Sequence, residues 1–136
     1  MIGKRLRAAA AFLLAERVRV RGWSMYPSLT PGEWVLIDRL AYRTGEPRRN
    51  EVVLALDPRD RGRPILKRIA GVPGDETAAG RMAPGEYFLV GDNPEFSTDS
   101  RAFGPVRRSD LIGRAWLVVW PPERFRPVAL PSVDPA

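Results

Sequence analysis

The chain of 136 residues contains no histidine and no cysteine. A Ser-His-Asp triad, a Cys-His dyad, disulfide bonds and a zinc site with histidine or cysteine ligands are therefore excluded. A hydrolase made from the remaining residue types needs another base for its nucleophile. Lysine is the leading candidate, because burial can lower its pKa until the amine is neutral near pH 7. Arginine cannot act in this way, since its guanidinium stays protonated.

Lysine is itself scarce in this chain. The 22 basic residues are 20 arginines and only two lysines, Lys4 and Lys67. Lys4 lies in the basic N-terminal flank, whereas Lys67 lies in the apolar sequence Ile65–Ile69, which predicts a strand. Such a lysine is compatible either with a solvated surface cation or with a desolvated amine. Because side chains alternate along a strand, Arg68 is expected to point to the opposite face of the sheet.

Ser24 is the candidate nucleophile. The alternating residues 17–21 predict a short strand with both valines on one face. Ser24 follows that strand on a turn bounded by Gly22 and Pro27. A hydroxyl at such a position can be exposed while its backbone is held, but many serines beside glycine and proline are ordinary turn residues.

Three segments of the chain resemble the motifs of bacterial type I signal peptidases. The segment Gly22–Leu29 (GWSMYPSL) resembles the serine box, and Leu66–Asp75 (LKRIAGVPGD) resembles the lysine box. The third segment runs from Gly91 to Arg101 (GDNPEFSTDSR) and continues through Phe103–Val106 (FGPV). Three matches in the family's order are far more specific than one.

This resemblance implies a Ser-Lys pair. Ser24 would attack the scissile carbonyl, and Lys67, as a neutral amine, would accept its proton. In the third segment, Ser97 matches the serine that orients the lysine amine, and Asp99 and Arg101 match a pair that braces the loop by an ion pair. An ordinary loop serine and a plain surface ion pair are the alternatives for these three residues.

The remaining candidate residues surround this pair. Asp92 and Asn93 are expected to shape the turn of the third segment by bonding nearby backbone groups. The backbone N–H of Ser24 can supply one oxyanion donor. Gly22 stands where some family members carry a serine hydroxyl as a further donor, and a glycine lets the backbone approach the substrate closely. Met25 is expected to pack beneath the nucleophile.

The function implied by the resemblance is a serine endopeptidase that removes an N-terminal leader or signal peptide. Its partner would be a precursor protein with small residues before the cut, and no metal or organic cofactor is needed. The third segment resembles a short branch of the family, without a spanning helix, that includes proteases proposed to mature nickel-type superoxide dismutases. One alternative is a self-cleaving LexA-like repressor-type domain, although no DNA-binding domain precedes Ser24 in this sequence. The other alternative is a non-catalytic binding module.

Short strands separated by turns predict an all-β fold, a signal-peptidase/LexA-like coiled sheet or barrel-like domain with a short N-terminal helix. We divide the chain into an N-terminal helix at residues 1–16, a single β domain at 17–120 and a proline-rich tail at 121–136, which we expect to be poorly ordered. Beyond the two strands of the serine and lysine segments, strands are expected at Glu33–Asp38, Glu51–Leu56, Glu86–Val90 and Leu111–Trp120.

The net charge of +6 raises the question of an anionic partner. The arginines are spread along the chain, so we expect no nucleic-acid partner. The apolar run Ala8–Ala15 is shorter than the roughly 20 residues that span a bilayer. We therefore expect residues 1–16 to pack on the domain or to contact a membrane surface. The predicted location is cytoplasmic or peripheral to a membrane, with membrane association as in signal peptidases the alternative.

Overall fold

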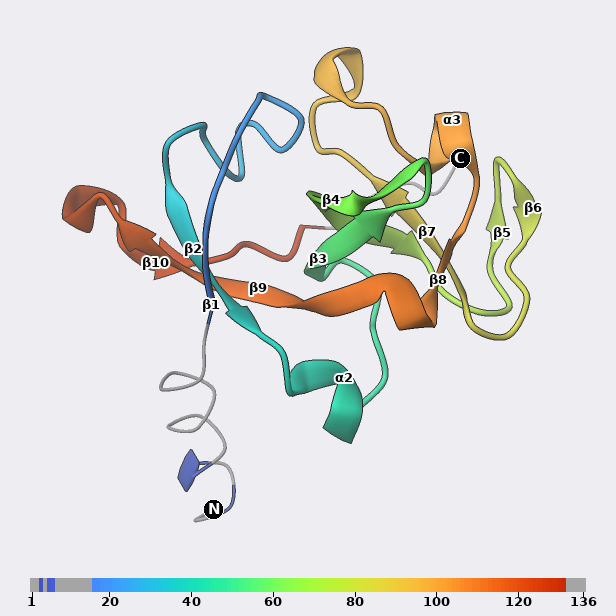
Figure 1. The fold of residues 1–136 in the computed structure, drawn as a ribbon, viewed down its shortest axis with the longest axis horizontal. Helices are drawn as coiled ribbons and strands as arrows, with labels where there is room; N and C mark the ends of the chain where they lie inside the picture. The colour runs from blue at the N-terminus through green and yellow to red at the C-terminus, as the bar shows by residue number, and fades with distance from the viewer. Residues whose placement is uncertain (1–2, 4, 7–15, 132–136) are drawn as a thin grey trace.

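A computed structural model describes residues 3, 5–6 and 16–131 of the chain. These residues form an antiparallel sheet of eight strands in the order β1-β2-β9-β3-β4-β7-β8, with β10 paired to β9 outside this path (Figure 1). The strands of the sheet are β1 (Glu16–Arg19), β2 (Trp34–Asp38), β3 (Val52–Asp57), β4 (Asp60–Gly71), β7 (Glu86–Val90), β8 (Val106–Arg107), β9 (Leu111–Trp120) and β10 (Arg126–Pro127).

Short elements connect these strands. A separate hairpin pairs two strands of two residues each, β5 (Glu76–Thr77) with β6 (Gly80–Arg81). The other regular elements are short helical turns, namely α2 (Ala41–Thr44), η1 (Pro94–Phe96), α3 (Ser100–Phe103), η2 (Arg108–Asp110) and η3 (Pro122–Arg124). The all-β class expected from the sequence is therefore confirmed.

Strand β9 holds the two halves of the domain together, because it pairs with β2 on one side and with β3 on the other. β2 follows the loop that carries Ser24, and β3 pairs with the strand that carries Lys67. Gly113 of β9 allows β2 to approach closely, since a Cβ atom there would lie 2.6 Å from the carbonyl oxygen of Asp38. The contact of these strands thus sets how the serine and lysine halves lie relative to each other.

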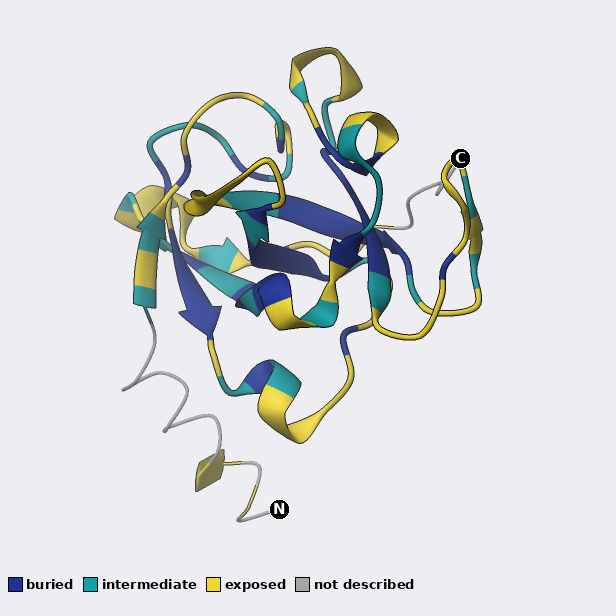
Figure 2. Cartoon of the chain, turned by 45° about the vertical axis from the view of Figure 1, so that its right-hand side comes forward, coloured by how far each residue is buried: buried dark blue, intermediate teal, exposed yellow. Residues whose placement is uncertain are grey.

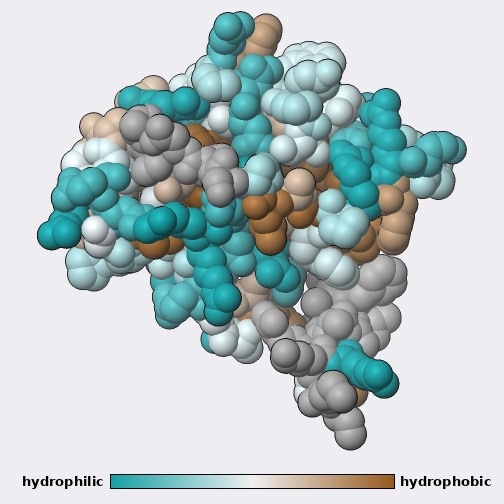
Figure 3. Space-filling view, turned by 180° about the vertical axis from the view of Figure 1, so that it is seen from behind, coloured by the Kyte–Doolittle hydropathy of each residue, from teal (hydrophilic) through white to brown (hydrophobic). Residues whose placement is uncertain are grey.

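The core consists of two main apolar clusters, and its residues concentrate in the central strands (Figure 2). One cluster lies beneath the serine loop and contains Val20, Met25, Leu29, Val35, Ile37, Val52, Leu54, Ala115, Val118 and Val128. The other lies on the lysine side and contains Val53, Ala55, Ile69, Tyr87, Leu89, Val106 and Leu111. Hydrophilic residues cover most of the face seen in Figure 3. The loop with Ser24 and the strand with Lys67 therefore each rest on a packed apolar layer.

The expected strands are present, and four of them differ in extent from the prediction. β1 covers residues 16–19 and not 17–21, β2 begins one residue later than predicted, and β3 is shifted by one residue toward the C-terminus. Residues 86–90 and 111–120 form strands with the predicted bounds, whereas β4 begins at Asp60 and is longer than the predicted Ile65–Ile69. Residues 60–63 belong to β4 because they continue its hairpin with β3, in which Asp57 pairs with Asp60 after a register irregularity. The connection between β2 and β3 begins with the short helix α2.

The prediction of a poorly ordered tail from residue 121 is wrong for residues 121–131. Arg126 and Pro127 pair with β9, and Val128 is buried in the core. Arg126 also forms an ion pair with the buried Glu33, with an Nη1–Oε2 distance of 2.8 Å. The proline content suggested disorder, but the arginine and valine side chains find partners that the sequence alone does not reveal. Residues 132–136 lie outside the described part of the chain.

The N-terminal helix predicted at residues 1–16 lies mostly outside the described residues. Gly3, Arg5 and Leu6 are helical, and Glu16 already belongs to β1. Within the described residues, no helix has both the length and the apolar character needed to cross a bilayer.

Candidate active site

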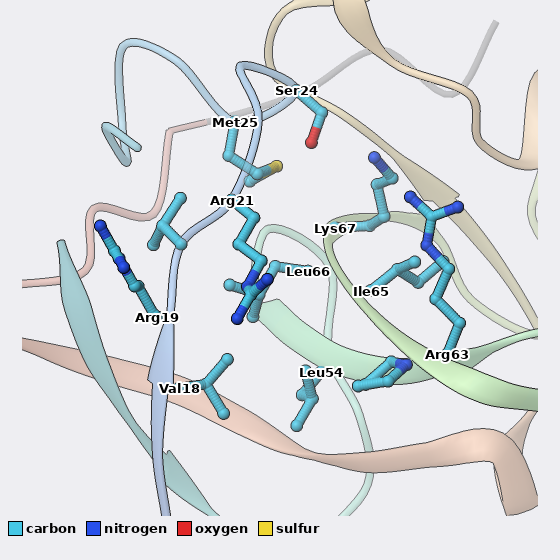
Figure 4. Close-up of a pocket in the computed structure, with 12 residues that line it drawn as sticks. Val18, Arg19, Arg21, Ser24, Met25, Leu54, Arg63, Ile65, Leu66 and Lys67 are labelled. Carbon is cyan, nitrogen blue, oxygen red and sulfur yellow. The ribbon is translucent and has the colours of Figure 1, made fainter. Parts of the chain in front are cut away.

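Ser24 and Lys67 line the same cleft, which has a volume of about 560 Å³. One wall is formed by β1 and the residues that continue it to Met25, and the other by residues 63–67 of β4, with Leu54 of β3 also lining the cleft. In Figure 4 the Ser24 hydroxyl and the Lys67 amine point toward one another across the cleft. Two residues that are 43 positions apart in sequence (67 − 24) are thus brought to one site by the sheet.

The serine loop is held by the third segment. The backbone N–H of Asn93 donates to the Ser24 carbonyl at 2.9 Å, and its Nδ2 donates to the Trp23 carbonyl at 3.0 Å. Asn93 therefore bonds a loop that lies 70 residues earlier, and not only its own turn as predicted. Gly22 adopts φ +71°, a left-handed conformation that favours glycine, so the turn itself requires this residue. Met25 is 1% exposed and packs in the core below the loop, as expected.

Lys67 is almost completely buried, at 6% exposed, and it lies opposite Val53 of β3. Within the described residues, its amine makes no hydrogen bond and no ion pair. Burial lowers the pKa of Lys67 below its ordinary value. The charge of Asp99 acts against this decrease, whereas the charge of Arg63 adds to it. The net effect favours the neutral amine, the form that can accept a proton.

Asp99 is the hydrogen-bond centre of the third segment, where it caps α3. It accepts from the Ser97 hydroxyl at 2.6 Å, from the Gly91 N–H at 2.9 Å and from the Arg101 guanidinium at 2.6 and 2.9 Å. Burial alone raises the pKa of this carboxyl, but the bonds from Arg101, Ser97 and Gly91 outweigh burial and lower it to about 2. The ion pair expected between Asp99 and Arg101 is therefore present.

Ser97 makes its bond to Asp99, and within the described residues it makes none to Lys67. An ionised carboxylate attracts the hydroxyl proton more strongly than a neutral amine does. The neighbouring Gly91 is a residue that the sequence did not single out as functional. A Cβ atom on Gly91 would lie 2.2 Å from the Ser97 Oγ and 2.7 Å from the Ser24 carbonyl oxygen, so glycine is needed where the two loops meet.

Asp92 differs from its expected role. Its carboxylate forms a bidentate pair with Arg68, with Nε–Oδ1 and Nη2–Oδ2 distances of 2.8 Å, and does not cap a nearby turn. The Arg68 side chain is fully buried on the face of β4 opposite to Lys67, and it also donates to the carbonyls of Asn50 and Ala129 at 2.6 and 2.8 Å. A buried arginine requires acceptors, but nothing in the sequence showed that Arg68 is buried, so its carboxylate partner could not be identified beforehand.

The profile of the family described as "Signal peptidase, peptidase S26" matches residues 5–82 and 76–120. The chain belongs to this family. It is 36% identical over 134 residues to mitochondrial inner membrane protease subunit 2 of Danio rerio, covering 90% of this chain and 73% of that protein. It is 40% identical over 119 residues to mitochondrial ATP-independent inner membrane protease subunit 1a of Arabidopsis thaliana, covering 78% and 71%.

A bacterial relative agrees with these two. The probable signal peptidase I-2 of Synechocystis sp. is 31% identical over 143 residues, which cover 82% of this chain and 66% of that protein. The resemblance seen in the three sequence segments is therefore confirmed at the level of the family. The protein is a peptidase of a family that removes leader peptides, and membership implies a precursor with a leader sequence as its substrate.

Proposed function

We propose that the protein is a serine endopeptidase in which Ser24 is the nucleophile and Lys67 the general base. The observation that carries this proposal is the buried amine of Lys67, which lacks an ion-pair partner among the described residues and faces the Ser24 hydroxyl in an open cleft. Burying a lysine without a counter-charge costs stability. Such a cost is typical of functional sites, where a perturbed pKa serves the chemistry.

The first half of the reaction uses Lys67 as base and then as acid. The neutral amine accepts the proton of the Ser24 hydroxyl while Oγ attacks the carbonyl carbon of the scissile peptide bond. The oxyanion accepts a hydrogen bond from the Ser24 N–H, which has no other partner among the described residues. When the C–N bond breaks, the Lys67 ammonium donates its proton to the leaving amine, and the acyl group stays on Ser24 as an ester.

The second half repeats this proton transfer with water. Neutral Lys67 accepts a proton from a water molecule, and the resulting hydroxide attacks the ester carbonyl. The Ser24 oxygen leaves and takes back the proton from Lys67, which restores the hydroxyl and the neutral amine. The products are the leader with a free carboxylate and the mature protein with a new N-terminus. Each step uses only residues of the cleft and water.

Two strand edges provide a place for an extended substrate. β1 lies at the end of the strand order, so within the described part of the chain only one of its edges is paired, with β2. Among the described residues, Asp60 and residues 64–67 of β4 pair with β3 alone, because the pairing of β4 with β7 begins at Arg68. Both free edges flank the cleft, and a peptide can add its main chain to such an edge while side chains enter small pockets. We propose that the substrate leader lies here and is cut after a small residue.

The form of the third segment favours, within this function, a leader of the nickel-type superoxide dismutase kind over a secretory signal. A test compares the full chain on peptides that span both kinds of junction. Ser24→Ala and Lys67→Arg should each lose turnover, because arginine keeps the charge but cannot be deprotonated. Lys4→Arg is the matched control, and it should keep turnover.

Mass spectrometry of a rapidly quenched reaction identifies the nucleophile directly. We expect an acyl adduct on the tryptic peptide that contains Ser24. An adduct on another residue, or normal turnover by Lys67→Arg, would refute the assignment of the two roles.

A further inference from the structure

The wall of the cleft is positively charged. Arg19 and Arg21 line it from the serine side and Arg63 from the lysine side, and none of the described aspartates and glutamates lines it. All three arginines are exposed. Within the part of the chain that the structure describes, none of them forms a hydrogen bond or an ion pair. Arg63 does contribute to the low pKa of Asp57, but that carboxylate is already bonded to Arg59.

Most other arginines of the domain are paired. Among the described residues, eleven form ion pairs with carboxylates, and they are Arg39, Arg49, Arg59, Arg61, Arg68, Arg81, Arg101, Arg108, Arg114, Arg124 and Arg126. The cleft therefore brings together cations that the protein itself leaves uncompensated. A carboxylate on a bound ligand could pair with these arginines.

Two of these cations are placed to meet a bound peptide. Figure 4 shows Arg21 projecting into the cleft from the serine wall and Arg63 running along β4 toward the Lys67 amine. Arg21 lies three residues before Ser24, and Arg63 four residues before Lys67. At about 3.3 Å per residue along a strand, their guanidinium groups reach substrate side chains within about five residues of the scissile bond.

We propose that the cleft selects leader junctions that carry an aspartate or glutamate within about five residues of the cut, bound by Arg21 and Arg63. This inference rests on the proposed function, in which a peptide lies in the same cleft. A guanidinium binds a carboxylate through two parallel hydrogen bonds, and a cleft lined by charges of one sign concentrates their attraction for an opposite charge. The residue at the cut stays small, while lysine or arginine in the flanking stretch is disfavoured by like charge.

The experiment uses matched peptides that differ only in charge. Each keeps the same small residue at the cut and carries aspartate or its neutral isostere asparagine at one flanking position. For the wild-type chain, kcat/KM should be about three- to tenfold higher for the aspartate peptide at one position or more. The difference should shrink at high ionic strength, because salt screens exposed charges.

Charge reversal identifies the residues. Arg21→Glu should abolish the preference or turn it toward a lysine peptide. Arg107→Glu is the matched control, because Arg107 is exposed on β8 and does not line the cleft. It makes the same change in net charge and should leave the preference intact. Arg63→Gln should weaken the preference and also shift the pH profile, since Arg63 contributes to the lowered pKa of Lys67.

The outcomes separate this inference from the proposed mechanism. Equal kcat/KM for aspartate and asparagine peptides in the wild type overturns the inference, and so does a preference that survives in the double variant Arg21→Glu/Arg63→Gln. Binding of the same peptides to Ser24→Ala, followed by NMR titration, needs no catalysis. Tighter binding of the aspartate peptide without any turnover by the wild type supports charge selection and refutes the catalytic proposal. Failure of Ser24→Ala to bind either peptide overturns the inference.

Discussion

The two faces of β4 differ in whether a buried basic side chain has partners. Lys67 and Arg68 are neighbours in sequence, and both side chains are nearly or fully buried. Arg68 lies on the face where Asp92 and two backbone carbonyls accept its hydrogen bonds. Lys67 lies on the cleft face and has no such partner among the described residues. One strand thus holds one compensated and one uncompensated basic residue side by side.

This difference indicates a structural role for Arg68 and a chemical role for Lys67. A compensated buried cation links segments that are distant in sequence, and Arg68 joins β4 to the third segment and to the C-terminal segment through Ala129. An uncompensated buried amine is destabilised as a cation, and this makes it a base at a moderate pH. The comparison therefore predicts opposite outcomes. Substitution of Lys67 should reduce activity, and substitution of Arg68 should reduce stability.

The largest effect is expected for Lys67→Met, which keeps the length of the side chain and removes the amine. We expect kcat to fall by about 10²- to 10⁴-fold, the usual contribution of a general base. The free energy of unfolding should be unchanged or higher. In the wild type, the lowered pKa of Lys67 means that the unfolded chain binds more protons than the folded one between the lowered and the ordinary pKa.

Stability of the wild type should therefore rise with pH through that window, and Lys67→Met should lack this rise. Denaturant unfolding at several pH values, together with peptide cleavage, measures both quantities. A variant that lost stability as well as activity would indicate a structural role for the lysine.

Arg68→Met is the counterpart on the other face. Removing this guanidinium leaves the carboxylate of Asp92 without its partner, and breaking a buried ion pair in this way costs about 3–5 kcal/mol. Asp92→Asn should cost a similar amount, and the double variant should cost much less than the sum of the two. Urea unfolding of the three variants measures the coupling, and additive losses would contradict the pairing.

Asp99 extends the comparison to a carboxylate. Its folded-state pKa of about 2 lies below the ordinary value, so the bonds around it stabilise the fold above pH 3.8. That contribution, about 2 kcal/mol by linkage, is lost as the pH falls from about 4 to 2. Asp99→Asn should therefore be less stable than the wild type at neutral pH, and the difference should vanish near pH 2. Thermal unfolding across this range is the measurement, and a difference independent of pH would exclude the linkage.

Gly91→Ala tests the contact between the serine loop and the third segment. The new Cβ would overlap the Ser97 Oγ and crowd the Ser24 carbonyl, so we expect a loss of about 1–3 kcal/mol together with reduced kcat. Gly62→Ala is the control, because its nearest atom, an Asp60 carboxylate oxygen, lies at an ordinary 3.5 Å. Equal effects of the two substitutions on kcat would show that Gly91 has no special role.

The sequence predicted most of the sheet because its strands carry clear patterns. The apolar run from Val52 and the mostly apolar run from Leu111 form β3 and β9. Ser24 and Lys67 could be named because the lack of histidine and cysteine leaves few bases, and because three segments resemble one family. Their positions in one cleft agree with that prediction, while their catalytic roles stay a proposal.

Contacts between segments that are distant in the chain could not be predicted from the sequence. Asp92 pairs with a residue 24 positions away, and local turn rules favoured the nearby backbone instead. The C-terminal segment from Pro121 was predicted to be disordered from its proline content, although Arg126 bonds Glu33, 93 residues earlier. Gly91 is required because a side chain there would clash with Ser97 and with the Ser24 carbonyl, which come close only in the folded structure. Each of these features is decided by tertiary structure and not by local preference.

The most direct test of the central claim is the pKa of Lys67. The chain has two lysines, so Lys4→Arg leaves Lys67 as the only one, and ¹³C-labelled lysine then gives a single side-chain signal in NMR. We predict that this signal titrates well below about 10.4, the value of an ordinary lysine, and that cleavage activity rises with pH through the same midpoint. A titration at or above about 10.4 would show that the amine stays protonated at neutral pH, and it would contradict the assignment of Lys67 as the base.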